Sequence, residues 1–275
     1  MLLLVDLDGV VYRGDRPVPG VPEVLAQRAL AGDAVVYVTN NSRWYRTDYL
    51  DRLAGMGAPV EAGCIVTAAR ATALALAAAP RLVPGGVAMV LGGPGLAHEL
   101  RDVGLHTVAP SPHGLARRPG ALVVGVDFAL SYRRLSLAAE AVRRGASFIA
   151  TNRDHVFPTP DGLAAGAGTI VAAVAVAVGR EPDLVVGKPE PGLFEQAARA
   201  ARLPLRGAVV IGDGLLTDVL AARRVGARSV LMLTGVTTPR ELAEATAANA
   251  ADGPTAVARD AGELALILED LSAAG

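Results

Sequence analysis

The sequence predicts an α/β protein built on mostly parallel sheets. Short runs of aliphatic and β-branched residues alternate with alanine-, leucine- and arginine-rich stretches of helical length along the whole chain. This alternation is typical of strand–helix–strand units, whose strands run parallel. The series restarts after the proline- and glycine-rich stretch "APRLVPGG" at 79–86, which is the best candidate for a domain boundary.

The first series begins with a predicted strand at 2–5, "LLLV", whose unbroken apolar character favours burial on both faces. A helix is predicted over 22–32, with Pro22 near its start and Gly32 past its end. The next apolar run, "AVVYV" at 34–38, predicts a second strand. Two further helices are predicted around 45–55 and over 67–78, the second with Thr67 as a candidate cap.

The second series predicts three strands, at 87–92, 121–127 and 147–151. The helices expected with them lie near 94–103, 134–144 and 168–178. The final part of the chain predicts a helix near 193–202, a strand at 208–212, a helix near 216–225, a strand at 229–233 and two more helical pieces. No repeat interrupts this order.

The composition narrows the classes of protein that the chain can belong to. Its 275 residues suffice for about two domains, and 52% are hydrophobic. The 26 basic and 27 acidic residues nearly balance, so the chain lacks the excess of positive charge that is typical of nucleic-acid-binding proteins. Cys64 is the single cysteine, which excludes an internal disulfide. Neither the start of the chain nor the apolar stretch 169–178 suits a signal peptide or a membrane helix, so we expect a cytoplasmic protein without a membrane partner.

Polar residues follow four of the apolar runs, where open α/β sheets bind their ligands. They are Asp6 and Asp8 in "DLDG", Thr39 to Ser42 in "TNNS", Lys188 after "LVVG", and Asp213 and Asp218 in "GDGLLTD". Lys188 is also the only lysine of the chain. Carboxylates gathered at one edge would repel each other unless a divalent cation lay among them, and Mg²⁺ favours one or two carboxylates with a substrate phosphate. The set therefore indicates phosphoryl transfer.

Each of these features also has an ordinary structural interpretation when it is taken alone. "DLDG" could be a turn at a strand end, "TNNS" and "GDGLLTD" could be turns or helix caps, and a lysine is commonly solvated. A calcium loop starting at Asp6 would need glycine at Val11 and glutamate at Pro17, and the chain has neither. The joint occurrence of the four segments, in order, favours a common site.

The segments "DLDGV", "VTNNS", "GKPEP" and "GDGLLTD" resemble, in this order, the motifs of the haloacid dehalogenase superfamily of Mg²⁺-dependent phosphohydrolases. The stretch from "VVGVDFALSYRR" to "GLAAGAGTIVAA" is similar to the large α/β cap of its para-nitrophenylphosphatase, phosphoglycolate and pyridoxal phosphatase group. The resemblance implies a Rossmann-like, doubly wound core in residues 1–82 and 185–275. It also implies an inserted cap in residues 83–184 that closes over the site.

The resemblance also implies a role for each core residue. Asp6 would attack phosphorus to form an aspartyl-phosphate, and Asp8 would protonate the leaving group and then activate water. Thr39, the Asn40 backbone and Lys188 would hold the phosphate. Asp6, the Asp8 carbonyl and Asp213 would bind Mg²⁺. Asp218 would not contact the ion directly but would help to position its ligands.

In the cap, the stretch "TNRDHVF" at 151–157 would form the substrate-selecting loop, with Asn152, Asp154 and His155 facing the substrate. The charge of Asp154 favours a leaving group that carries hydroxyls, such as a polyol or sugar phosphate. Arg43 could line the same cleft or lie on the surface, with Trp44 and Tyr45 packing near its edge. The stretch "LGGPG" at 91–95 lacks the spacing of a phosphate loop and predicts a turn into a helix.

The leading expectation is a Mg²⁺-dependent phosphatase for a small phosphorylated metabolite, and analogy with the family raises a homodimer through the cap. A dehalogenase is disfavoured, because it has no alkoxide to protonate and lacks the second aspartate that is present here as Asp8. A phosphotransferase or mutase that uses the same chemistry stays open. So does a non-catalytic protein that binds a phosphometabolite, although the complete set of polar residues speaks against a decayed site.

Overall fold

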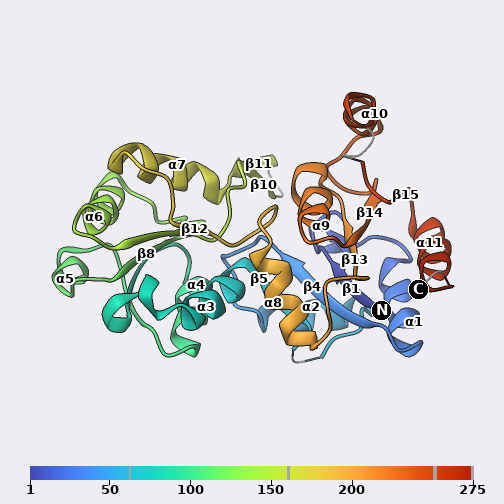
Figure 1. Cartoon of the computed structure of the whole chain (residues 1–275), viewed down its shortest axis with the longest axis horizontal. Coiled ribbons are helices and arrows are strands. Elements are labelled where there is room, and N and C mark those ends of the chain that lie inside the picture. The colour runs from blue at the N-terminus through green and yellow to red at the C-terminus, as the bar shows by residue number, and fades with distance from the viewer. Residues whose placement is uncertain (62, 160–161, 250–252, 274–275) are drawn as a thin grey trace. The chain divides into compact units, whose positions relative to one another are not determined.

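The computed structural model describes residues 1–61, 63–159, 162–249 and 253–273 (Figure 1). Its contacts divide the chain into two compact units. The first unit comprises Met1–Thr39, Thr47–Val66 and Lys188–Gly275, and the second comprises Asn40–Arg46 and Thr67–Gly187. Residues 67–82 thus group with the second unit. The boundaries that the resemblance implies, 83 and 184, stay a prediction.

The first unit contains a six-stranded sheet in the order β15-β14-β13-β1-β4-β5. The strands are β1 (Leu2–Val5), β4 (Ala34–Thr39), β5 (Ile65–Thr67), β13 (Val209–Gly212), β14 (Arg228–Met232) and β15 (Ala256–Ala258). β1 pairs in parallel with β4 on one side and with β13 on the other. The strand order therefore reverses at β1, and such a reversal opens a crevice at the carboxyl ends of the strands.

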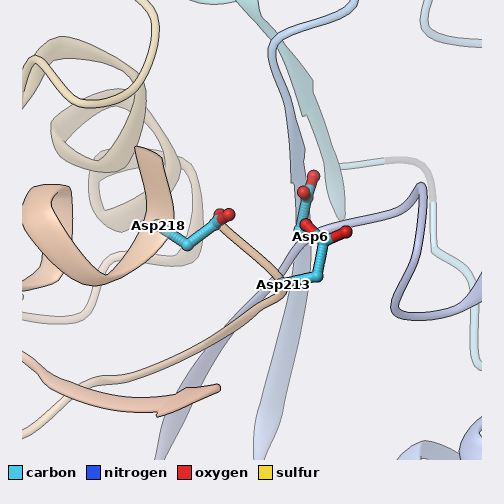
Figure 2. Close-up of side chains that lie close together, drawn as sticks. All are labelled: Asp6, Asp213 and Asp218. Carbon is cyan, nitrogen blue, oxygen red and sulfur yellow. The ribbon is translucent and has the colours of Figure 1, made fainter. Parts of the chain in front are cut away.

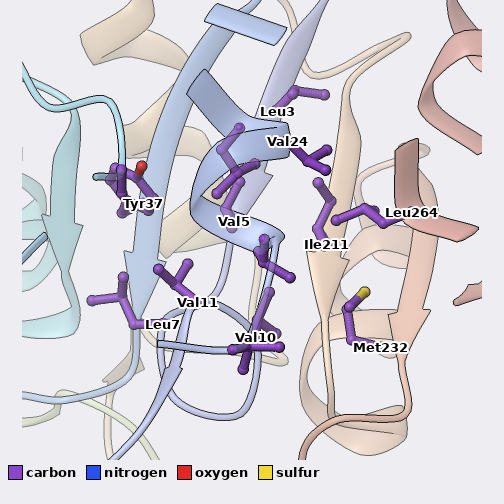
Figure 3. Packing of buried hydrophobic residues seen from close by; sticks show 14 of the residues in the cluster. Leu3, Val5, Leu7, Val10, Val11, Val24, Tyr37, Ile211, Met232 and Leu264 are labelled. Atoms are coloured by element: carbon purple, nitrogen blue, oxygen red, sulfur yellow. The ribbon is translucent and has the colours of Figure 1, made fainter. Parts of the chain in front are cut away.

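Helices cover both faces of this sheet, as a doubly wound fold requires. They are α1 (Val21–Leu30), α2 (Asp48–Gly55), α8 (Gly192–Ala201), α9 (Leu220–Arg224) and α11 (Ala261–Ala273). A further helix, α10 (Pro239–Ala248), has exposed or half-buried side chains throughout its described residues. Leu3 and Val5 of β1 pack in one cluster with Val24 of α1 and Leu264 of α11 (Figure 3). The alternate residue Leu4 is equally buried but lies outside that cluster, and α8 contacts β1 and β4.

The second unit contains a five-stranded parallel sheet in the order β12-β9-β8-β6-β7. The strands are β6 (Val87–Leu91), β7 (His106–Val108), β8 (Ala121–Val124), β9 (Ser147–Ala150) and β12 (Leu184–Val185). The helices are α3 (Ala68–Ala78), α4 (Pro94–Asp102), α5 (Pro112–Ala116), α6 (Tyr132–Arg143) and α7 (Ala167–Val178). Leu122 of β8 packs towards α6 and α7, and its neighbour Val123 packs towards α3 and α4. The predicted α/β class is confirmed in both units.

Several elements escape the sequence pattern because they are short. They include two hairpins, formed by β2 (Tyr12–Arg13) with β3 (Arg16–Pro17) and by β10 (Val156–Thr159) with β11 (Gly162–Ala165). The predicted cap is confirmed, since the Thr67 hydroxyl accepts a hydrogen bond from the Arg70 amide. The helix expected near 216–225 is instead a π-helical turn, Leu215–Val219, followed by α9. Such turns are frequent at functional sites.

The expectation that Lys188 follows a strand of the six-stranded sheet is wrong. The apolar run before Lys188 contains β12, which pairs with β9 in the second unit. Lys188 therefore enters the first unit on the returning connection, just before α8, and not from the end of a strand of the six-stranded sheet. No helix in the described part of the chain combines the length and the apolar character needed to cross a membrane.

Candidate active site

Three neighbouring strands of the first unit deliver polar residues to one edge of the sheet. Asp6 directly follows β1, Asp213 directly follows β13, and Thr39 is the last residue of β4. The Asp6 amide still donates to Ile211 O across the sheet, at 2.8 Å, so its backbone position is held by the β1–β13 pairing. Because parallel strands end at the same edge, residues far apart in the sequence meet at the switch point.

The carboxylates of Asp6, Asp213 and Asp218 converge at this edge. One oxygen of each lies within 4.8 Å of those of the other two, a spacing that could hold a metal ion. Figure 2 shows the carboxyl groups of Asp6 and Asp213 side by side, with Asp218 directed towards them from the π-helical turn. Asp213 and Asp218 are 5% and 1% exposed, so water solvates their charges only weakly.

Lys188 supplies the positive charge of this group. Its Nζ lies 2.9 Å from Oδ1 of Asp6 and 2.7 Å from Oδ1 of Asp218. Burial alone would lower the pKa of Lys188, but the two carboxylates outweigh it and raise that pKa, so the ammonium stays charged. Asp218 also accepts hydrogen bonds at Oδ2 from the Gly214 amide and the Thr217 hydroxyl. Its two oxygens thus orient Lys188 and the turn that carries Asp218.

One ammonium does not balance three buried carboxylates. Burial raises the pKa of Asp6 well above its usual value, and Asp218 and Asp213 raise it further, while Lys188 opposes them. Burial and the charge of Asp218 raise the pKa of Asp213 to about 6. Burial and the mutual repulsion of the carboxylates thus both disfavour three negative charges beside one ammonium. A divalent cation would supply the compensating charge, and the all-oxygen donor set suits Mg²⁺.

Asp8 has surroundings that differ from those of Asp6. Burial raises its pKa, with Arg52 and then Lys188 opposing that effect. The Arg52 guanidinium lies 3.7 Å from the centre of the Tyr12 ring, and Tyr12 forms a β-bridge with Asp8. A raised pKa favours the protonated carboxyl, the form that a general acid needs.

The other predicted site residues fall in the second unit. Asn40 Nδ2 donates to both carboxylate oxygens of Asp154, at 3.0 and 3.1 Å, and Asn152 Nδ2 donates to Asn40 O at 2.7 Å. His155 is exposed, and its carbonyl accepts hydrogen bonds from the Gly166 amide and the Thr169 hydroxyl. Asp6, Asp213, Asp218 and Lys188 thus meet in the first unit, and Asn40, Asn152 and Asp154 are hydrogen-bonded to one another in the second, while His155 lies outside that set.

The segment after Asn40 also belongs to the second unit. The Arg43 guanidinium lies 4.5 Å from the centre of the Trp44 ring and 4.2 Å from that of Phe128. The Tyr45 hydroxyl donates to Asp102, and its ring stacks on His98 with centroids 3.9 Å apart. The stretch 91–95 leads into α4, as expected for a turn rather than a phosphate loop.

Gly9 and the loop after β14 were not found from the sequence, although both shape the acidic cluster. The Asp213 carboxylate accepts a hydrogen bond from the Val236 amide at 2.8 Å, and the Thr234 hydroxyl donates to Gly9 O. A Cβ at Gly9 would lie 2.1 Å from Asp213 Oδ2, and one at Gly235 would lie 1.8 Å from it. Applying the strand-end rule to "SVLML" would have pointed to the loop.

Replacing Gly9 by alanine is expected to lower kcat/KM at least a hundredfold, because the new methyl group would displace Asp213. The φ of +81° at Gly9 adds a strain of about 1–2 kcal/mol for any residue with a Cβ. Gly14→Ala is the matched control, since Gly14 has a φ of +54° and a methyl group there would meet nothing within 4 Å. Urea unfolding should show the cost of the positive φ in both variants and a larger loss in Gly9→Ala, where the methyl group also collides with Asp213, and kinetics should show an activity loss in Gly9→Ala alone. Equal activities would contradict the prediction.

The fold and this site define an α/β protein with an acidic, metal-binding centre at the switch point of a parallel sheet. Residues 3–106 match the model of the haloacid dehalogenase-like hydrolases, and residues 185–264 match a second HAD-hydrolase-like model. The chain belongs to the family of haloacid dehalogenase-like hydrolases, which confirms the resemblance stated from its motifs.

Known proteins similar to this chain include several that are named as phosphatases. It is 40% identical to chronophin of Homo sapiens over 242 residues, covering 85% of this chain and 81% of that protein. The structure of a p-nitrophenyl phosphatase from Archaeoglobus fulgidus matches with a TM-score of 0.86 and 32% identity, covering 97% and 98% of the two chains. A glycerol phosphate phosphatase from Mycobacterium tuberculosis, solved in complex with magnesium, matches with a TM-score of 0.84 and 34% identity, covering 96% and 75%.

Proposed function

We propose that this protein is a Mg²⁺-dependent phosphatase that hydrolyses a small phosphorylated metabolite through an aspartyl-phosphate. The observation that carries the proposal is the meeting of Asp6, Asp213 and Asp218 with the single lysine, Lys188, at the edge of the sheet. Relatives named as phosphatases, among them one solved with magnesium, support it.

Asp6, Asp213 and the carbonyl of Asp8 would hold the Mg²⁺ ion. Asp218 takes a supporting role, because both of its oxygens already accept hydrogen bonds from Lys188 and the π-helical turn. Bound Mg²⁺ would neutralise the carboxylates and the charge that develops on the phosphoryl group. Lys188, whose ammonium contacts Asp6, would also neutralise charge on the phosphoryl group.

Asp6 acts as the nucleophile. One of its oxygens forms a bond to phosphorus while the bond from phosphorus to the ester oxygen breaks, and Asp8 gives its proton to the departing alkoxide. Asp8, now a carboxylate, then takes a proton from the water that attacks the aspartyl-phosphate. This second step releases inorganic phosphate and restores both carboxyl groups. Thr39 and the Asn40 backbone would hold the phosphate oxygens throughout.

Stabilisation by Mg²⁺ is expected to depend on pH through Asp213, whose pKa is raised to about 6. A raised folded-state pKa stabilises the metal-free protein at low pH, and this contribution is lost as the pH rises through 6. At pH 7.5, Mg²⁺ at a hundredfold excess over its dissociation constant should add about 2.7 kcal/mol to the free energy of unfolding. At pH 5, protons compete at Asp213 and also at Asp6, whose pKa is raised too, so the gain should fall by about 1.4 kcal/mol or more.

Thermal unfolding with Mg²⁺ or with a chelator, at both pH values, measures this difference. In Asp213→Asn, the Mg²⁺ effect should be small at either pH, because a metal ligand is lost. An equal Mg²⁺ effect at pH 5 and pH 7.5 in the unsubstituted protein would speak against Asp213 as a ligand.

The direct test of the proposed function is a screen of phosphomonoesters, with Mg²⁺ and with a chelator. Glycerol phosphates, phosphoglycolate, pyridoxal phosphate, sugar phosphates, nucleoside phosphates and para-nitrophenyl phosphate cover the leaving-group classes. Mg²⁺-dependent release of inorganic phosphate is the expected result. Transfer of phosphate to an added alcohol would indicate a phosphotransferase, and tight phosphate binding without release would indicate a non-catalytic binding protein.

The remaining expectations stay predictions. They are the selection of the leaving group by Asn152, Asp154 and His155, closure of the cap over the site, pairing of two copies through the cap, and a cytoplasmic location. The relatives named as glycerol phosphate phosphatases make a polyol phosphate the first substrate class to test.

A further inference from the structure

Asn40, Asn152 and Asp154 form a closed set of hydrogen bonds within the second unit. Asn152 Nδ2 donates to Asn40 O at 2.7 Å, and the Asp154 amide donates to Asn152 Oδ1 at 3.0 Å. Asn40 Nδ2 completes the circuit by donating to both carboxylate oxygens of Asp154, at 3.0 and 3.1 Å. Each member therefore bonds to both of the others, through backbone and side-chain groups together.

Burial shields two members of this set from water, while Asp154 is half-buried. Asn152 is 2% exposed and Asn40 is 9% exposed, so water offers little replacement for a lost hydrogen bond. A buried polar network whose members are satisfied holds one geometry, and removal of one member leaves the others with uncompensated polar groups. Asp154 is the charged member, which strengthens the two bonds that it accepts from Asn40.

The backbone of Gly187 lies directly against this set. The Gly187 amide donates to Thr151 O at 2.7 Å, directly before Asn152. A Cβ at Gly187 would lie 2.6 Å from Asn40 Oδ1 and 2.8 Å from the Asn152 Cβ. The backbone of Gly187 thus lies against both amide side chains, at a distance that only glycine allows.

Chain connectivity links this set to the phosphate site. Asn40 directly follows Thr39, and Gly187 directly precedes Lys188. Thr39 and Lys188 are the two residues whose side chains would hold the phosphate under the proposed function. The chain neighbours of both therefore either belong to the hydrogen-bonded set, as Asn40 does, or lie against it, as Gly187 does.

We propose that Asn152 and Asp154 are positioning residues for the phosphate site, which they set by holding Asn40 and Gly187. This inference rests on the proposed function and, for Asn152 and Asp154, replaces the predicted role in selecting the leaving group. Because the phosphate is common to all substrates, loss of the set lowers kcat/KM by the same factor for every substrate. A residue that contacts the leaving group would instead change the ranking of substrates.

The test compares Asp154→Ala with the unsubstituted protein on para-nitrophenyl phosphate and on a glycerol phosphate. We expect kcat/KM to fall roughly tenfold to a hundredfold, by the same factor for both esters. Inorganic phosphate has no leaving group, so its inhibition constant should rise by a similar factor as kcat/KM falls. Arg144→Ala is the control, since exposed Arg144 follows α6 and pairs with Glu140, and it should leave all three values unchanged.

Two further variants keep the proposal testable if Asp154→Ala fails to fold. Asp154→Asn retains the shape but places an amide against the Asn40 amide, so it should show the same uniform loss to a smaller extent. If Asp154 acts through Asn40, the double variant Asn40→Ala/Asp154→Ala should be no worse than Asn40→Ala alone. Additive losses would overturn the proposal, as would a changed substrate ranking with an unchanged phosphate inhibition constant.

Calorimetric titration with inorganic phosphate and Mg²⁺ separates this inference from the proposed function. If the unsubstituted protein binds phosphate but hydrolyses no ester, the proposed function fails, while weaker phosphate binding by Asp154→Ala still supports positioning. If hydrolysis is seen and Asp154→Ala binds phosphate as well as the unsubstituted protein does, positioning fails and the proposed function stands.

Discussion

Asp6→Asn is expected to abolish hydrolysis of para-nitrophenyl phosphate, with a loss in kcat of roughly 10⁴-fold or more, as is usual when a covalent nucleophile is removed. The amide is a poor nucleophile and also a poorer metal ligand than the carboxylate. Rates are measured with Mg²⁺ in excess over a wide range, so that weaker metal binding alone does not account for the loss. Activity within a factor of ten of that of the unsubstituted protein would refute Asp6 as the nucleophile.

Two controls make that result specific. The Asp6→Asn variant should keep its fold, because Lys188 retains its 2.7 Å contact with Asp218 and the asparagine has the shape of the aspartate. Unfolding in urea checks this point. Asp8→Asn should leave the nucleophile intact but remove the proton donor, so glycerol phosphate, with its basic alkoxide, should suffer more than the nitrophenyl ester.

Lys188→Met is expected to lower the free energy of unfolding of the metal-free protein by about 3–5 kcal/mol, the usual cost of removing one partner of a buried ion pair. Lys188 is 2% exposed and contacts both Asp6 and Asp218, so methionine leaves buried carboxylates without their cation. Hydrolysis should be lost as well, because the phosphoryl group loses a neutralising charge. Urea unfolding in the presence of a chelator and assays with Mg²⁺ measure the two effects separately.

The double variant Lys188→Met/Asp218→Asn identifies the cause of the stability loss. Removing the charge of Asp218 should restore part of the lost free energy, because one uncompensated buried charge disappears. A double variant that is less stable than Lys188→Met would show that the methionine itself, rather than the unpaired carboxylate, destabilises the core.

The fold class and most elements were predictable because they follow from local regularities. The apolar run at 2–5 forms β1, and the alternation of strands and helices specifies parallel sheets. The helix at 67–78 was expected with its Thr67 cap, and the cap is formed. Helix ends, apolar runs and turn residues act over a few neighbouring positions, so a single sequence reveals them.

The core site was predictable in its residues but not in its contacts. The order of the four motif segments, followed by the strand-end rule, was enough to single out Asp6, Asp213 and Lys188. It did not reveal that Lys188 arrives on the connection after β12, nor that Gly9 must lack a side chain beside Asp213. Those facts depend on segments that are far apart in the chain and meet only after folding.

The sequence by itself thus determined the class of fold, the family and the chemical groups available for phosphoryl transfer. The tertiary structure alone decided which of those groups touch, how deeply they are buried and hence in which direction their pKa values move. It also placed Asn40 beside Asp154, 114 positions away along the chain. The physical reason is that periodicity and turn chemistry are local, whereas burial and the pairing of charges depend on how the entire chain packs.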